Sequence, residues 1–214
     1  RKTVPKYLTL EESIQLLDSV KDPSPAVTAR DYCMLTLLLN CGMRVSELVG
    51  IDLGDIRDNT LRLLGKGNKE RMVYLNPACL SALENYLKFR KQPETGDDRN
   101  ALFLSAQHRR MTTRRVEQIV EKYLKACGLD GRGYSPHKLR HTAATLMYQH
   151  GGVDIRALKE ILGHANIGTT EIYTHISNQM IEQAANASPL SAVKRRMSEQ
   201  ELLLRQLEQD QTSQ

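Results

Sequence analysis

Apolar residues recur along most of the chain at the three- and four-residue spacing of an amphipathic helix. Thr9 followed by Glu12 has the pattern of a capping box, which predicts a helix over residues 10–20. Residues 28–41 are apolar on nearly all sides and predict a buried central helix that ends at Gly42. Further helices are predicted over residues 77–91, 112–127 and 154–162, and from Pro136 onwards with Ser135 as the N-cap.

The helical pattern is interrupted between residues 56 and 75. TLRLL and RMVYL in this region have the character of short strands, and the segment GKGNKE between them is rich in the residues that form hairpin turns. The predicted fold class is therefore mostly α with one small β-hairpin or sheet.

The segment after Ser188 has a different pattern. The stretch LSAVKRRMSEQELLLRQLEQ places apolar residues at coiled-coil-like spacing, which predicts a long amphipathic helix. These apolar residues are Leu190, Val193, Met197, Leu204 and Leu207.

Composition narrows the class of protein only modestly. The chain has 214 residues, 26% of them charged, and a net charge of +5, so nucleic acid is a candidate partner and no more. Four scattered cysteines without a CxxC pair are typical of reduced thiols packed as small hydrophobic residues. No apolar run has the length of a membrane span and no signal peptide is recognisable. Because the chain opens at Arg1, we expect a fragment that lacks an upstream domain.

The stretch SPHKLRHTAA brings His137, Arg140 and His141 close together at the start of a predicted helix. Three interpretations are open for this cluster. The two histidines have the spacing of a zinc site, but Lys138 stands where metalloproteases place a glutamate. They could instead be structural, or the cluster could bind an anion through a guanidinium fork and an imidazole donor.

Three other segments favour the anion site. Arg44 directly follows the apolar helix, Lys66 lies in the glycine-rich turn, and LGHANIGTTEIYTH contains His164 and Tyr173. Taken in order with HKLR, these residues resemble the catalytic domain of the tyrosine recombinase (phage integrase) family. The segments CGMRVSEL, SPHKLRHTAATLM and LGHANIGTTEIYTH are most similar to the bacterial Xer-type branch of this family. The resemblance covers roughly residues 5–188.

The resemblance implies a site-specific recombinase that needs neither a metal nor a cofactor. Tyr173 would attack a DNA phosphodiester and form a 3′-phosphotyrosyl link, while two arginines hold the phosphate. The implied catalytic residues are Arg44, Lys66, His137, Arg140, His164 and Tyr173. Among them His137 would be the general base, His164 a donor to the phosphate and Lys66 the general acid. Glu47 and His141 are expected to support them.

The implied partner is double-stranded DNA, and no membrane is involved. The candidate DNA contacts are Lys69, Arg71, Arg109, Arg110, Arg114 and Arg115. Residues 1–188 would form the catalytic domain, and the N-terminal core-binding domain of the family would be absent. Residues 189–214 would contact a neighbouring protomer in a DNA-bound tetramer, or else fold back on their own domain.

We also expect accessory proteins and a location on the nucleoid in the bacterial cytoplasm. Two alternative functions stay open at this point. One is DNA relaxation of the type IB topoisomerase kind, and the other is DNA binding without catalysis.

Overall fold

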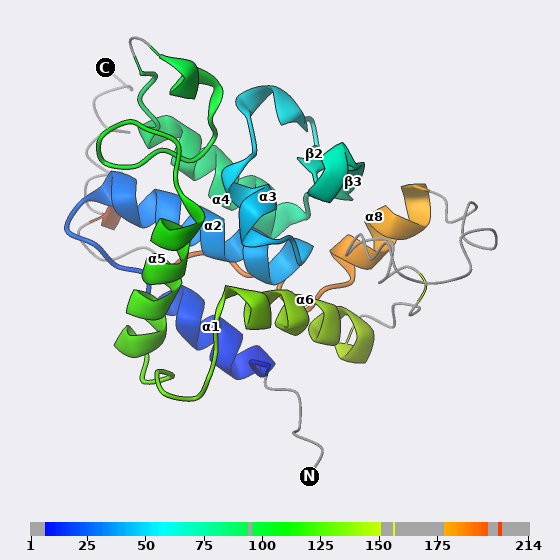
Figure 1. Cartoon of the computed structure of the whole chain (residues 1–214). Coiled ribbons are helices and arrows are strands. Elements are labelled where there is room, and N and C mark those ends of the chain that lie inside the picture. The colour runs from blue at the N-terminus through cyan, green and yellow to red at the C-terminus, as the bar shows by residue number, and fades with distance from the viewer. Residues whose placement is uncertain (1–6, 94–95, 151–155, 157–177, 197–200, 203–214) are drawn as a thin grey trace, which may run out of the picture.

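The computed structural model of the protein describes residues 7–93, 96–150, 156, 178–196 and 201–202 (Figure 1). Within these ranges the fold is mostly helical with one small antiparallel sheet, as the sequence predicts. No helix of the described part is both long and apolar enough to cross a membrane.

The α-helices are α1 (Leu10–Asp18), α2 (Pro25–Cys41), α3 (Val45–Val49), α4 (Pro77–Phe89), α5 (Thr113–Ala126), α6 (Pro136–His150) and α8 (Asn178–Asn186). Short 3₁₀ helices are η1 (Leu53–Asp55), η2 (Lys66–Asn68) and η3 (Asp97–Asn100), and the strands are β1 (Ile56–Arg57), β2 (Thr60–Leu64) and β3 (Glu70–Tyr74).

Helix α2 lies at the centre of the molecule and packs against α4 on one side and α6 on another (Figure 1). Every residue from Thr28 to Cys41 is buried, which confirms the predicted central helix. The predicted start at Thr28 was wrong, because the helix begins at Pro25. Ser24 caps it by accepting a hydrogen bond from the Val27 N–H, and a proline in the first turn loses no intrahelical bond.

The sheet contains the predicted hairpin and one additional short strand. Strand β2 pairs with both β1 and β3, and its register with β3 places Leu63 opposite Arg71. Leu61, Leu63 and Val73 are buried on the face that meets the core. The turn between β2 and β3 contains η2, so Lys66 lies at the exposed end of the hairpin.

A buried polar network holds α5 against α2. Tyr123 on α5 donates its hydroxyl proton to Asp31 at 2.7 Å, and Asp31 also accepts from Arg30 at 2.9 Å. Burial and the Asp31 carboxylate raise the pKa of Tyr123 far above its ordinary value, so the phenol stays protonated and acts as a donor. This network fixes the orientation of α5, whose first turn contains Arg114 and Arg115, two of the predicted DNA contacts.

The helix predicted immediately after Ser188 is not formed over residues 190–196, which adopt turns and irregular backbone. Leu190 is fully buried in the core, and the carbonyl of Ser191 accepts a hydrogen bond at 2.8 Å from the N–H of Ala78. That N–H belongs to the first turn of α4, where helical N–H groups lack an intrahelical partner. The start of the tail therefore packs on its own domain. The helix predicted over residues 154–162 lies outside the described residues apart from residue 156.

Candidate active site

The junction between α2 and α3 positions Arg44. Gly42 adopts a left-handed backbone (φ 62°, ψ 28°) that ends α2, and Arg44 then becomes the N-cap of α3. Glu47, in the first turn of α3, accepts from the backbone N–H of Arg44 and from its guanidinium, both at 3.1 Å. The Glu47 side chain is 1% exposed whereas that of Arg44 is 43% exposed. A buried carboxylate thus holds an arginine that still reaches solvent.

A second arginine reaches the same carboxylate from the sheet. Arg71 on β3 forms an ion pair with Glu47 at 2.6 Å, and its side chain is 14% exposed. The hairpin backbone also passes close by, since a Cβ atom added to Gly65 would lie 3.7 Å from Glu47 Oε1. Arg71, which we predicted to contact DNA, therefore lies inside the cluster rather than on the open surface.

Arg140 on α6 is the third guanidinium group of the cluster and lies near enough to Arg44, Arg71 and Glu47 to interact with their charges. It is 5% exposed. Burial, followed by repulsion from Arg44 and Arg71, lowers the pKa of Arg140 to about 10, and the charge of Glu47 only partly offsets this. The cluster consequently retains an excess of positive charge in a partly dry environment. Such an arrangement favours binding of an anion.

His137 and His141 form a pair one helical turn apart on α6. Their Nε2 atoms are 3.0 Å apart and the two rings meet edge to face with centroids 4.6 Å apart. A hydrogen bond between two imidazole nitrogens requires one of them to be an acceptor, so one ring is neutral. Partial burial, then His137, Lys138 and Arg140, lower the pKa of His141. Among the described residues, no group of three or more His, Cys, Asp or Glu side chains is placed to hold a metal ion.

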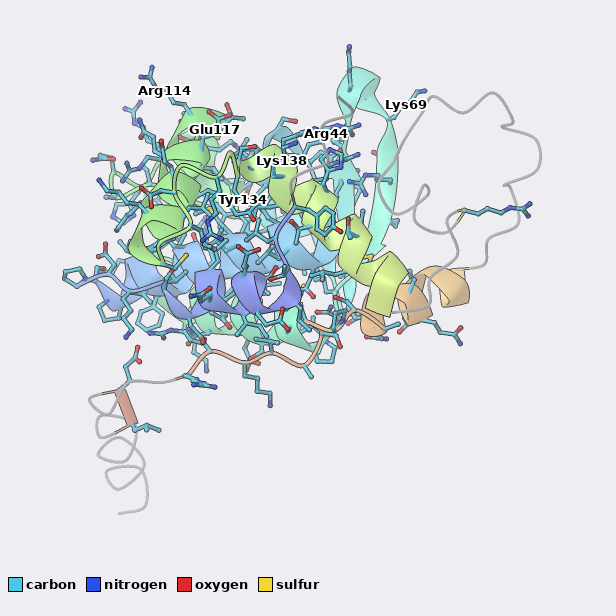
Figure 2. All side chains as sticks on the ribbon, turned by 90° about the horizontal axis from the view of Figure 1, so that it is seen from below. Arg44, Lys69, Arg114, Glu117, Tyr134 and Lys138 are labelled. Carbon is cyan, nitrogen blue, oxygen red and sulfur yellow. The ribbon has the colours of Figure 1, made fainter. Side chains whose placement is uncertain are left out.

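A pocket of about 510 Å³ opens beside this cluster. Arg44, His137 and Arg140 line it, and Glu117 and Tyr134 are among the other lining residues. In Figure 2, Arg44, Glu117 and Tyr134 lie in one region, contributed by the start of α3, by α5 and by the segment before α6. The pocket can therefore admit a ligand that touches the two arginines and the histidine at once.

The predicted DNA contacts separate into exposed and structural residues. Arg109, Arg114, Arg115 and Lys69 are exposed, as is Lys66. Figure 2 shows Arg114, Arg44 and Lys69 on the same side of the molecule.

Arg110 differs from these exposed residues, because its guanidinium contacts other groups of the protein. Its guanidinium donates to the carbonyls of Val49 (2.9 Å) and Ile51 (3.3 Å) and pairs with Asp52, so it ties the loop after α3 in place. The predicted His164 and Tyr173 lie outside the described residues.

Comparison with known proteins identifies the family. The sequence pattern described as the phage integrase family matches residues 6–180. The chain belongs to the phage integrase family. It is 53% identical over 188 residues to the tyrosine recombinase XerC of Caldanaerobacter subterraneus subsp. tengcongensis (strain DSM 15242 / JCM 11007 / NBRC 100824 / MB4), covering 87% of this chain and 52% of that protein. It is 41% identical over 187 residues to XerC of Corynebacterium glutamicum (strain ATCC 13032), covering 86% of this chain and 59% of that protein.

Solved structures of Xer recombinases have the same fold. The crystal structure of XerA recombinase gives a TM-score of 0.66 at 30% identity, covering 85% of this chain and 64% of the other. The XerH site-specific recombinase bound to palindromic difH substrate, in a post-cleavage complex, gives 0.67 at 30% identity over 86% of this chain and 53% of the other. This member of the phage integrase family thus spans between about half and two thirds of the length of these relatives.

Sequence reasoning missed the place of Arg71 in this phage integrase family member. In RMVYL the side chains alternate between the two faces of the strand, so Arg71 lies on the same face as the buried Val73. That alternation was a usable signal for burial. The carboxylate that receives Arg71 comes from α3, however, and no local pattern links the two segments.

Proposed function

We propose that this chain performs the DNA cleavage and rejoining steps of a site-specific tyrosine recombinase. The observation that carries the proposal is the convergence of Arg44, Arg140 and His137 on one pocket, with the buried Glu47 holding Arg44. The names of the relatives support strand exchange over simple DNA relaxation or DNA binding without catalysis.

The proposed reaction is a transfer between phosphate esters. The Tyr173 phenolate oxygen attacks the phosphorus, a P–O bond to tyrosine forms, and the P–O5′ bond breaks to release a 5′-hydroxyl. The reverse attack by a 5′-hydroxyl rejoins the strand. Arg44 and Arg140 would bind the two non-bridging oxygens and stabilise the charge that accumulates on them in the transition state.

Two proton transfers accompany this exchange. Tyrosine ordinarily ionises near pH 10, so His137 would accept its proton while His164 donates a hydrogen bond to the phosphate. Lys66, at the end of the hairpin, would protonate the departing 5′-oxygen. His141 would support His137 through their 3.0 Å contact, which fixes the orientation of the His137 ring.

The exposed basic residues around the pocket suit a duplex backbone. We propose that Lys69, Arg109, Arg114 and Arg115 contact phosphates of double-stranded DNA. For Arg110, contacts to Val49, Ile51 and Asp52 support a role in shaping this surface.

The placement of the start of the tail supports a proposal about the oligomer. In Figure 2 the coil after α8 runs along the side opposite Arg44 and Arg114. We propose that residues 1–188 with the packed start of the tail form the catalytic unit. The later part of the tail, after residue 196, would contact a neighbouring protomer in a tetramer on bacterial nucleoid DNA, where accessory proteins join it.

The test begins with covalent capture. Wild-type protein is incubated with fragments of genomic DNA from its source, denatured, and the DNA that stays attached is sequenced to give the captured site. Nicked duplexes built on that site trap the adduct, because the short fragment that carries the released 5′-hydroxyl diffuses away and cannot rejoin the strand. We expect Tyr173→Phe to bind these duplexes like wild type and to form no adduct. An adduct in this variant would refute the assignment of the nucleophile.

A two-site assay separates the recombinase from a topoisomerase. Two duplexes carrying the captured site should exchange strands in the presence of the protein. Relaxation of a supercoiled plasmid without any strand exchange would favour the topoisomerase alternative instead.

A further inference from the structure

Arg71 has an environment that differs from that of a DNA-contacting arginine. Its side chain is 14% exposed and lies 2.6 Å from the carboxylate of Glu47, which is 1% exposed. Arg62, on the neighbouring strand, is 46% exposed and forms ion pairs with Asp55 and Glu70 on the outer face. The two arginines of the same hairpin thus have opposite environments, and Arg71 is the one directed at the active site.

We propose that Arg71 is a positioning residue for Lys66. The Glu47–Arg71 ion pair fixes the base of the β2–β3 hairpin against α3, and so fixes where the Lys66 ammonium can reach relative to Arg44. This inference rests on the proposed function, in which Lys66 is the general acid.

The first step is the connection between Arg71 and the loop. Arg71 is paired with Leu63, two rungs of the ladder below the hydrogen bond from Gly65 N–H to the Lys69 carbonyl (2.8 Å) that closes the loop. At about 3.3 Å per residue along a strand, this separation is roughly 7 Å. Leu63–Arg71 and Gly65–Lys69 belong to one antiparallel ladder, with only the Leu64–Glu70 pair between them. A displacement of Arg71 is therefore transmitted to the loop that carries Lys66.

The second step is the connection between Glu47 and both sides of the site. One carboxylate accepts from Arg44, which is the N-cap of α3, and from Arg71, which belongs to the sheet. It also lies close to Gly65, the residue directly before Lys66, because an added Cβ there would be 3.7 Å from Glu47 Oε1. Arg44 and the residue directly before Lys66 therefore both lie next to the carboxylate of Glu47.

The charge and the shape of the Arg71 side chain both contribute to its pairing with Glu47. A lysine in place of Arg71 could keep the attraction to Glu47 but could not reproduce the planar fork of the guanidinium. A glutamine would keep neither the charge nor the length. The proposal therefore predicts a graded loss, with Arg71→Lys milder than Arg71→Gln.

The decisive experiment compares two leaving groups at the captured site. One nicked duplex has the natural 5′-oxygen at the scissile phosphate and the other has a bridging 5′-sulfur. A thiol ordinarily ionises near pH 8.5, so sulfur departs as a thiolate without a proton from Lys66. Adduct formation is measured under single-turnover conditions with protein in excess. The ratio of the two rates, taken on one preparation, cancels any loss of folded protein.

We expect Arg71→Gln to slow adduct formation on the oxygen substrate by about 10- to 100-fold, as a displaced catalytic group does. On the sulfur substrate the same variant should approach the wild-type rate. Lys66→Ala is the reference, with a loss of about 10²- to 10⁴-fold on oxygen and recovery on sulfur. Arg62→Gln is the matched control from the same hairpin, and it should behave like wild type on both substrates.

The outcomes separate the two proposals. Equal losses for Arg71→Gln on oxygen and sulfur, with recovery of Lys66→Ala on sulfur, would overturn the positioning role and leave the general acid in place. A Lys66→Ala variant that sulfur does not restore would remove Lys66 as the acid, and the positioning role with it. A loss in Arg62→Gln equal to that in Arg71→Gln, restored by sulfur in the same way, would assign the effect to the hairpin as a whole and overturn the specific role of Arg71.

Discussion

Removal of the Glu47 carboxylate is the sharpest test of how the arginine cluster is held. In Glu47→Ala, three guanidinium groups stay close together without the anion that lies between two of them. The pair with Arg71 dominates the expected loss, because both side chains are largely buried. Breaking a buried ion pair from one side costs about 3–5 kcal/mol. The pair with Arg44 adds little, since the Arg44 side chain is 43% exposed and well screened.

The loss is large enough to measure in two ways. For a domain of this size, 1 kcal/mol corresponds to a shift of about 2–4 °C in Tm, so Glu47→Ala should melt roughly 6–20 °C below wild type. Urea denaturation gives the free energy of unfolding independently. Sulfate should then restore part of the loss, because a dianion can occupy the place between the guanidinium groups. At 100 times its Kd, such a ligand contributes about 2.7 kcal/mol.

Sulfate also stabilises folded proteins in general by exclusion from their surfaces, so a matched control is required. Leu190→Ala serves this purpose, because Leu190 is fully buried on the tail side of the core and its loss also destabilises the protein. The gain from sulfate, relative to chloride at equal ionic strength, should be larger in Glu47→Ala than in Leu190→Ala. A loss below about 1 kcal/mol, or equal gains in the two variants, would refute the electrostatic description of the cluster.

Three further predictions address other parts of the molecule. Arg44→Lys should bind the captured site but form the adduct about 10²–10³-fold more slowly, as when a transition-state donor is lost; a near-normal rate would argue against a guanidinium fork on the phosphate. Leu190→Ala should lose about 2–5 kcal/mol of unfolding free energy, measured with urea, whereas an unchanged stability would mean that the start of the tail does not pack on its own domain. His141 has a lowered pKa in the folded protein, so the unfolded chain binds more protons and stability falls as pH drops through the ordinary histidine range. His141→Gln should therefore show a flatter dependence of stability on pH between about 5 and 7, and an unchanged slope would contradict the shift.

Local chemistry made several helix ends predictable. The capping box at Thr9 and Glu12 and the left-handed Gly42 were both recognisable from residue type and spacing alone. The start of α2 was missed although Ser24 and Pro25 have the same kind of signal. Ser24 is a good N-cap and Pro25 a good first-turn residue, so the start of α2 was also recognisable from residue type.

Long-range contacts explain what the sequence could not predict. The spacing of Leu190 and Val193 fits an amphipathic helix, but Leu190 instead enters the core and Ser191 bonds to the N-terminal turn of α4. These contacts join residues that are far apart in the sequence. The helical periodicity of the tail therefore cannot predict them. The same limit applies to Glu47. Its spacing suggested a contact with Arg44, but only the fold brings Arg71 to its other oxygen.

The excess positive charge of the cluster destabilises the folded state. Binding of a phosphate at this site would offset that loss of stability. Burial and two neighbouring guanidinium groups lower the pKa of Arg140 to about 10, which leaves it charged at neutral pH. Keeping it charged therefore costs the folded state on the order of 3 kcal/mol. An anion held between Arg44 and Arg140 would return that free energy on binding, and it would return more as negative charge accumulates on the oxygens in the transition state. A second carboxylate beside Glu47 would halve the excess positive charge of the cluster and stabilise the fold, yet it would reduce this gain. The excess of two positive charges, from three guanidinium groups and one carboxylate, is thus the property by which the site would favour the reacting phosphate over the empty pocket.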